Sequence, residues 1–158
     1  MAKLLSESEG TTDIQMSGNP PTCVAEVMTR NVVALSPEQS FQEAITLIAR
    51  HRFRHLLVTD AKGHLAGVIS DRDLLRFMIR EPHWESATVA DVMKSDLVTA
   101  TPATSLSAAI GEMLSRRINC LPVVEADGRL VGILTSTDLL RAFQQIQEQI
   151  EQRDAVDL

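Results

Sequence analysis

The hydrophobic pattern of residues 24–76 predicts a strand, a helix, two strands and a second helix. An apolar run at residues 32–35 indicates the first strand, which ends at a Ser-Pro step that turns the chain. Ser40 stands three residues before Glu43, which is the spacing of a helix capping box. The helix that follows has one apolar face at helical spacing, formed by Phe41, Ala44, Ile45 and Ile48.

The rest of the pattern predicts a β-hairpin and a final helix. Apolar runs at residues 55–59 and 65–69 are joined by Asp60-Ala61-Lys62-Gly63, a hairpin loop with glycine where a positive φ is expected. The polar residues 70–73 then begin a helix, because serine and aspartate satisfy the free N–H groups of a first helical turn.

The whole pattern occurs twice. Residues 24–76 align on residues 89–141 without a gap, with Met28 on Met93, and 20 of the 53 aligned pairs are identical. Chance would give about one identity in sixteen, so the chain contains an internal repeat. One unit of this size buries only a marginal core, and we expect the two to pack through their sheets with pseudo-twofold symmetry. The predicted fold class is α/β, of the α+β type, with two βαββα repeats.

Composition and charge exclude several functions. The chain has 15 Lys and Arg against 21 Asp and Glu, a formal charge of −6, and only 3% aromatic residues. Nucleic-acid binders need basic residues and stacking platforms, so no nucleic-acid partner is expected. The apolar runs are too short to cross a bilayer, so no membrane partner is expected. Cys23 and Cys120 lack the spacing of a disulfide framework or a metal site, and we predict a cytoplasmic protein without metal.

The predicted organisation leaves no room for a catalytic domain. No nucleophile elbow, Walker loop or GxGxxG dinucleotide motif occurs, so we expect no enzyme. The expected segments are a flexible leader at 1–22, the first repeat at 23–80, a linker at 81–88, the second repeat at 89–145, and a C-terminal helix extension and tail at 146–158.

Both copies resemble the cystathionine-β-synthase (CBS) domain. The resemblance rests on VMTRNVVALSP and HLLVTDAKGHLAGVISDRDLL in the first copy, and on VMKSDLVTATP and CLPVVEADGRLVGILTSTDLL in the second. The pair resembles a tandem CBS, or Bateman, module. The resemblance implies a regulatory module that binds an adenosine ligand between the repeats: AMP, ADP or ATP first, and S-adenosylmethionine or NAD as further candidates. It also implies a homodimer that acts on a partner protein in trans. The alternative is an adaptor on the same fold that binds no nucleotide.

The resemblance also indicates candidate ligand contacts. A helix N-terminus offers N–H groups to a phosphate, and a nearby carboxylate can accept ribose hydroxyls. The same Ser/Thr-x-x-Asp pattern would equally serve as a plain helix cap. The predicted contacts are Val33, Ser36, Arg54, His55, Ile69, Ser70, Arg72 and Asp73 in the first copy, and Val98, Thr101, Leu134, Thr135, Thr137 and Asp138 in the second.

The two copies differ in charge at these positions. Arg54-His55 in the first copy aligns with Asn119-Cys120 in the second, and Arg72 aligns with Thr137. We expect Arg54, His55 and Arg72 to make one cleft basic and suited to a phosphate chain, while the other cleft is neutral. Arg54 and His55 could instead be solvated surface residues.

The C-terminal helix carries an additional apolar stripe. Its packing partner is expected to be its own module or a second copy of the chain. The stripe consists of Leu139, Leu140, Phe143, Ile146 and Ile150.

Overall fold

The computed structural model describes residues 3–4 and 19–156. The first repeat has the predicted order of elements, and the second has the same order except that its predicted first strand is reduced to an isolated bridge at Ala100. The fold class predicted from the sequence is confirmed. The first repeat comprises β2 (Val33–Leu35), α1 (Phe41–His51), β3 (His55–Thr59), β4 (Leu65–Ser70) and α2 (Asp71–Arg80). The second comprises α4 (Leu106–Arg116), β5 (Cys120–Val124), β6 (Leu130–Thr135) and α5 (Ser136–Val156). Short helices are η1 (Val24–Glu26), η2 (Trp84–Ser86) and α3 (Val89–Val92).

Each repeat contains a β-hairpin. β3 pairs antiparallel with β4, and β5 with β6, and the turns contain Gly63 and Gly128 at φ values of +85° and +86°. β2 adds a parallel strand to the first hairpin. The second copy has in its place the single parallel bridge between Ala100 and Val123.

Most of the predicted leader, residues 1–22, lies outside the described residues. Within it, β1 (Lys3–Leu4) pairs antiparallel with β2 at the edge of the first sheet. The Thr22 N–H donates to Glu26 Oε2 at 2.8 Å, which joins the end of the leader to the first turn of η1.

The two repeats exchange their opening segments, so that the start of each one pairs with the last strand of the other. Thr29 N–H donates to Ile133 O, and Ile133 N–H donates to Thr29 O, both at 2.9 Å. Val68 and Lys94 form the pseudo-equivalent pair of bonds, at 3.0 and 2.9 Å. The opening segment of the first repeat, residues 24–29, therefore belongs to the second repeat's core, and α3 at the start of the second repeat belongs to the first repeat's core.

Three clusters of buried side chains follow from this exchange. The second repeat's cluster includes Val24, Val27 and Met28 from the opening segment of the first repeat. The first repeat's cluster includes Val89 and Val92 from α3. The third cluster joins the two sheets at the pseudo-twofold axis, as the sequence predicts, and its buried members are Val32, Leu57, Val68 and Ile133.

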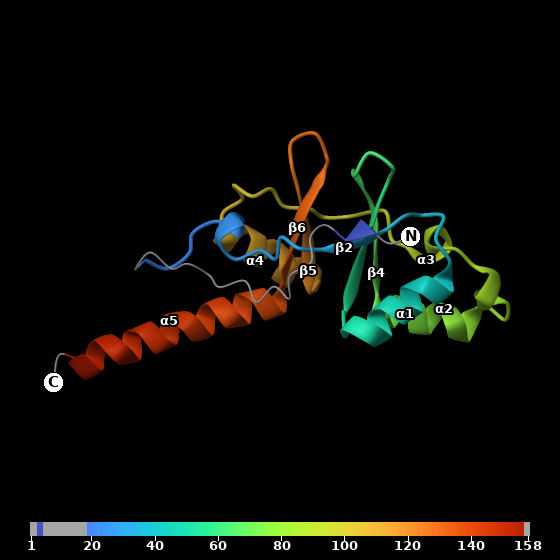
Figure 1. Cartoon of the computed structure of the whole chain (residues 1–158). Coiled ribbons are helices and arrows are strands. Elements are labelled where there is room, and N and C mark those ends of the chain that lie inside the picture. The colour runs from blue at the N-terminus through green and yellow to red at the C-terminus, as the bar shows by residue number, and fades with distance from the viewer. Residues whose placement is uncertain (1–2, 5–18, 157–158) are drawn as a thin grey trace.

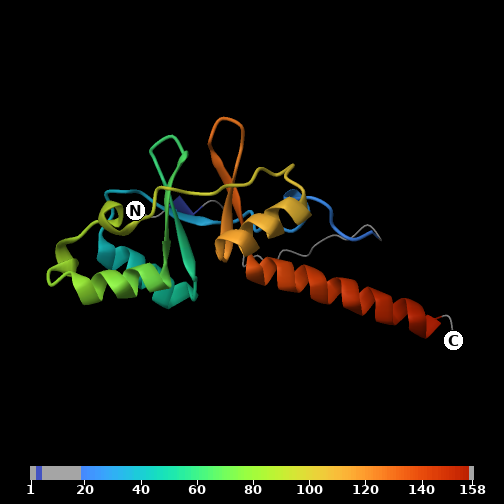
Figure 2. The same cartoon turned by 180° about the vertical axis from the view of Figure 1, so that it is seen from behind.

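The hairpins stand side by side, with α1, α2 and α5 below them and with α3 and α4 on the two sides (Figure 1). The hairpin tips are joined by Leu65 N–H to Gly128 O and Leu130 N–H to Gly63 O, at 3.2 and 3.0 Å. α5 is longer than its counterpart α2 and extends away from the body, as the reverse view also shows (Figure 2). No helix in the described part of the chain is both long enough and apolar enough to span a membrane.

Gly132 should not tolerate a side chain, because the exchanged segment passes close to it. A Cβ there would lie 2.8 Å from Thr29 O, a backbone atom that cannot move aside without disturbing the pairing with Ile133. We expect Gly132→Ala to reduce the free energy of unfolding by about 1–3 kcal/mol, as overpacking does. Gly111→Ala is the control, since nothing lies within 4 Å of its Cβ position on α4. It should raise stability by up to about 1 kcal/mol. Urea denaturation distinguishes the two, and equal effects would contradict the close approach.

Candidate functional site

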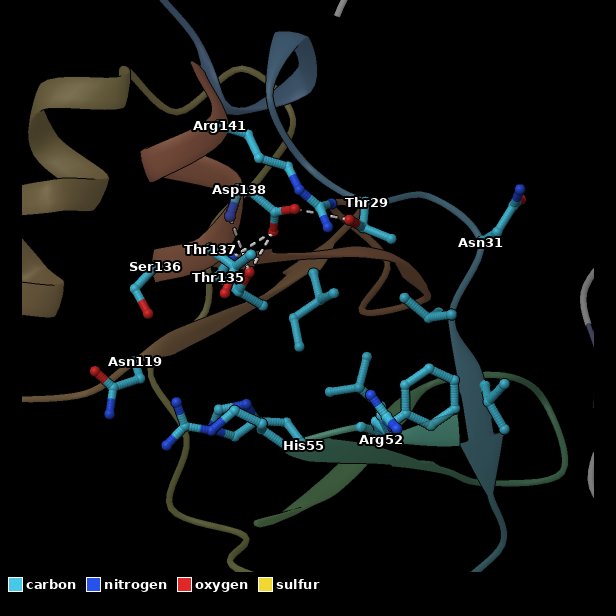
Figure 3. Close-up of a pocket in the computed structure, with 16 residues that line it drawn as sticks. Thr29, Asn31, Arg52, His55, Asn119, Thr135, Ser136, Thr137, Asp138 and Arg141 are labelled. Carbon is cyan, nitrogen blue, oxygen red and sulfur yellow. Dashed lines mark hydrogen bonds between the residues drawn. The ribbon is translucent and has the colours of Figure 1, made fainter. Parts of the chain in front are cut away.

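A cleft of about 350 Å³ lies where the two repeats meet. Its walls come from the start and middle of the first repeat and from the end of the second (Figure 3). The lining residues are Thr29, Asn31, Val32, Val33, Arg52, Phe53, Arg54, His55, Leu57, Asn119, Ile133, Thr135, Ser136, Thr137, Asp138 and Arg141.

Asp138 supplies the one carboxylate among these lining residues, and its two oxygens accept different hydrogen bonds. Its Oδ2 accepts the Thr135 N–H and the Thr135 hydroxyl, each at 2.7 Å, and so caps α5. Its Oδ1 accepts the hydroxyl of Thr29 at 2.9 Å (Figure 3). A carboxylate has about four acceptor positions, so one remains for a ligand hydroxyl. Asp138 can therefore both cap the helix and bind a hydroxyl.

The opposite wall begins where α1 ends. Arg52 terminates α1 in the left-handed conformation at φ +54°, which turns the chain into β3 and brings residues 52–55 along the cleft. Burial lowers the pKa of the His55 imidazole, nearby Asp71 opposes this and Arg54 adds to it. His55 thus favours its neutral form, in which one ring nitrogen can accept a hydrogen bond.

The cleft is basic although the whole chain is acidic. The lining contains Arg52, Arg54 and Arg141 and a single carboxylate, that of Asp138, in a chain with a formal charge of −6. Arg54 also lies 4.0 Å from Asp71, an exposed pair that is worth little in water. The first turn of α5, with Ser136 and Thr137, adds the positive end of a helix dipole. The arrangement suits a ligand that has both hydroxyl and anionic groups.

Six residues predicted from the sequence line this cleft. They are Val33, Arg54, His55, Thr135, Thr137 and Asp138. Thr29, Arg52 and Arg141 also line the cleft and were not predicted from the sequence. Arg141 ends the Leu-Leu-Arg run and Thr29 follows the Val-Met pair, so both adjoin motifs that the repeat already highlights.

Five predicted residues lie elsewhere. Ile69 and Leu134 are fully buried in the cores of the two repeats, and Val98 packs against the second core. Ser36 N–H donates to Gln39 Oε1 at 2.8 Å, and Ser36 borders a separate cavity beside the first hairpin loop. Thr101 N–H donates to Thr104 Oγ1 at 2.9 Å. Both hydroxyl residues stand in turns, the alternative role that a Ser/Thr-Pro step allows.

Ser70, Arg72 and Asp73 belong to the pseudo-equivalent position on the other side of the molecule. The expected grouping of Arg54, His55 and Arg72 does not occur in the described cleft, which combines Arg54 and His55 with Thr137. The physical reason is that this cleft takes its helix N-terminus from the second repeat, so Arg72 at the start of α2 is not part of it. Cys120, which aligns with His55, is largely buried, and burial raises the pKa of its thiol to about 11.

Both repeats match one known domain family. The sequence matches the CBS domain at residues 24–80 and again at residues 89–145. The chain belongs to the CBS-domain family. It is a tandem CBS pair, with the two-repeat architecture described above.

Solved CBS-pair structures resemble the whole folded body. AcuB from Vibrio cholerae is 29% identical with a TM-score of 0.75, over 82% of this chain and 96% of AcuB. CBSX2, crystallised with AMP, is 32% identical with a TM-score of 0.74, over 80% of this chain and 99% of CBSX2. The CBS pair of MJ0100, crystallised with 5′-methylthioadenosine and S-adenosyl-L-methionine, is 26% identical with a TM-score of 0.72, over 80% of this chain and 98% of that pair.

Curated relatives share only a part of their length with this chain. Inosine-5′-monophosphate dehydrogenase of Nitrosopumilus maritimus is 35% identical over 72% of this chain and 22% of the dehydrogenase. Arabinose 5-phosphate isomerase KpsF of Escherichia coli is 34% identical over 74% of this chain and 36% of the isomerase. The chain thus spans between a fifth and two fifths of these enzymes, and their activities do not transfer to it.

The lowered pKa of His55 predicts a pH dependence of stability. The unfolded chain binds this proton near pH 6.5, whereas the folded chain binds it only at lower pH. The contribution of neutral His55 to the free energy of unfolding is therefore fully present above about pH 6.5 and is lost as the pH falls below that value. Urea unfolding between about pH 7 and 5 should show this loss, and His55→Gln should reduce it. Carboxyl groups with lowered pKa, such as Asp73, act at lower pH, since their ordinary value is 3.8. An identical slope in both proteins would contradict the prediction.

Proposed function

We propose that this CBS pair is a regulatory module that binds a phosphorylated adenosine ligand, AMP, ADP or ATP, in the Asp138 cleft. The observation that carries the proposal is the combination, in one cleft, of a carboxylate with an open acceptor position and three arginines. A ribose supplies hydroxyl donors and a phosphate supplies the negative charge. One ligand of this class can therefore both donate a hydrogen bond to the carboxylate and pair with the arginines.

The cleft offers a surface for each part of such a ligand. Asp138 and Thr29 suit the ribose hydroxyls, and the apolar side chains of Val33 and Ile133 suit the base. The start of α5 and the arginines suit the phosphate. S-adenosylmethionine, which carries a positive sulfonium, fits this charge less well, and NAD remains a further candidate.

The relatives support this ligand class. CBSX2 binds AMP, and the MJ0100 pair binds 5′-methylthioadenosine and S-adenosyl-L-methionine. All three ligands contain adenosine, whereas only AMP contains a phosphate. The basic cleft of this chain favours the phosphorylated member.

Exposed apolar residues on equivalent helices support a homodimer. Leu75 on α2 is 59% exposed and its counterpart Leu140 on α5 is 68% exposed. Phe143 and Ile150 extend this surface along α5, while Leu139 and Ala142 of the same helix pack on the second repeat. A second copy would cover these side chains, and a ligand-dependent change in its arrangement would signal to a partner protein in trans.

The second candidate is an adaptor that binds no nucleotide. It is favoured by one observation, namely that Asp73 and Asp138 both satisfy a helix cap with the same geometry. A residue that caps a helix needs no further role. Binding measurements distinguish the two candidates.

Replacing Asp138 should separate binding from stability. Asp138→Ala and Asp73→Ala each remove an equivalent cap, at a cost of about 1 kcal/mol. Only Asp138 lines the described cleft, so its loss should weaken AMP binding about 10- to 100-fold, the effect of a charged hydrogen bond. Asp73→Ala should retain the wild-type affinity. Isothermal titration with AMP, ADP and ATP measures this, and the absence of binding to the wild-type protein would favour the adaptor.

The proposed homodimer predicts a charge-sensitive assembly. Leu140→Asp would place a carboxylate in the apolar surface of α5, so we expect the protein to become monomeric in sedimentation equilibrium. Ala61→Asp adds the same charge at an exposed hairpin loop and should leave the dimer intact. A wild-type monomer, or equal behaviour of the two variants, would contradict this part of the proposal.

A further inference from the structure

The pseudo-twofold axis places a different residue on each of the two capping carboxylates. Asp138 Oδ1 accepts the hydroxyl of Thr29 at 2.9 Å. Asp73 is the counterpart of Asp138, and its Oδ1 lies 2.7 Å from the ammonium of Lys94. Lys94 aligns with Thr29 in the repeat, and both reach their carboxylate through the same exchanged backbone pairing.

The helix-capping hydrogen bonds of the two carboxylates are equivalent. Asp73 Oδ2 accepts the Ser70 N–H at 3.0 Å and the Ser70 hydroxyl at 2.6 Å, as Asp138 Oδ2 does from Thr135. Both carboxylates are largely buried, with 9% of the Asp73 side chain and 6% of Asp138 exposed. The residue on Oδ1 is therefore the main difference at the carboxylate itself.

A lysine and a threonine beside the carboxylate have opposite effects on the binding of a ribose. The threonine hydroxyl donates and accepts, so it can join a network with ribose hydroxyls. The ammonium only donates, neutralises the carboxylate and brings a four-carbon stem next to it. Burial raises the pKa of the Asp73 carboxyl, but the bonds from Lys94 and Ser70 outweigh burial and keep the pKa below its usual value. The Asp73 carboxylate is thus already paired with the ammonium of Lys94, a side chain that is itself 62% exposed.

We propose that Lys94 closes the Asp73 side of the module to a ribose, so that the chain binds one adenosine ligand, in the Asp138 cleft. Lys94 is then the residue that determines the stoichiometry of the pair, and Thr29 is the residue that permits binding. This inference rests on the proposed function and adds to it the number of ligands and the cause of the asymmetry.

Exchanging the two residues tests the inference. Lys94→Thr places on Asp73 the residue found beside Asp138, and Thr29→Lys does the reverse. Lys62→Thr is the matched control, because it removes the same charge from an exposed hairpin loop. Isothermal titration with adenosine and with AMP gives the number of sites, and adenosine avoids repulsion of a phosphate by Asp71, the residue after Ser70. Thermal melting verifies that each variant is folded.

We expect one adenosine per chain in the wild-type protein and in Lys62→Thr, two in Lys94→Thr, and at least a tenfold loss of affinity in Thr29→Lys. Two ligands per wild-type chain, or a single ligand in Lys94→Thr, would overturn the role of Lys94 while leaving the proposed function intact. An absence of binding in both the wild-type protein and Lys94→Thr would overturn the proposed function, and this inference with it.

Discussion

The candidate site depends on two pairs of backbone hydrogen bonds across the pseudo-twofold axis. The pairings of Thr29 with Ile133 and of Lys94 with Val68 bind the opening segment of each repeat to the last strand of the other. Because these residues are far apart in sequence, their pairing orders both repeats together. Without it, the Asp138 cleft would lack Thr29, and each repeat's buried cluster would lose the apolar residues that the exchanged segment supplies.

This arrangement gives a ligand a means of acting on the whole module. The walls of the cleft belong to both repeats, from residues 52–55 on one side to Thr135–Asp138 on the other. A ligand that contacts both walls stabilises the arrangement in which they are close, to the extent that it binds that arrangement more tightly. The cleft includes the first turn of α5, the helix that extends away from the body and exposes Leu140 and Phe143. Asp138 therefore lies on the same helix as the surface proposed for assembly.

Local features of the fold could be predicted from the sequence because they depend on neighbouring residues. The capping box of Ser40 with Glu43 and the positive φ of Gly63 are found as predicted. Contacts made across the axis could not be predicted in this way. The bond from Thr29 to Asp138 joins residues 109 positions apart, and no periodicity reports it. For the same reason the sequence does not reveal that the described cleft combines Arg54 and His55 with the helix N-terminus of the second repeat rather than with Arg72.

A crystal structure of the protein grown with AMP would test directly whether the ligand binds in the Asp138 cleft, because it locates the ribose and the phosphate in one measurement. We expect a ribose hydroxyl on Asp138 Oδ1, the phosphate next to the first turn of α5 and the arginines of the cleft, and Lys94 still on Asp73. A ribose bound to Asp73, with Lys94 displaced and the Asp138 cleft empty, would contradict it.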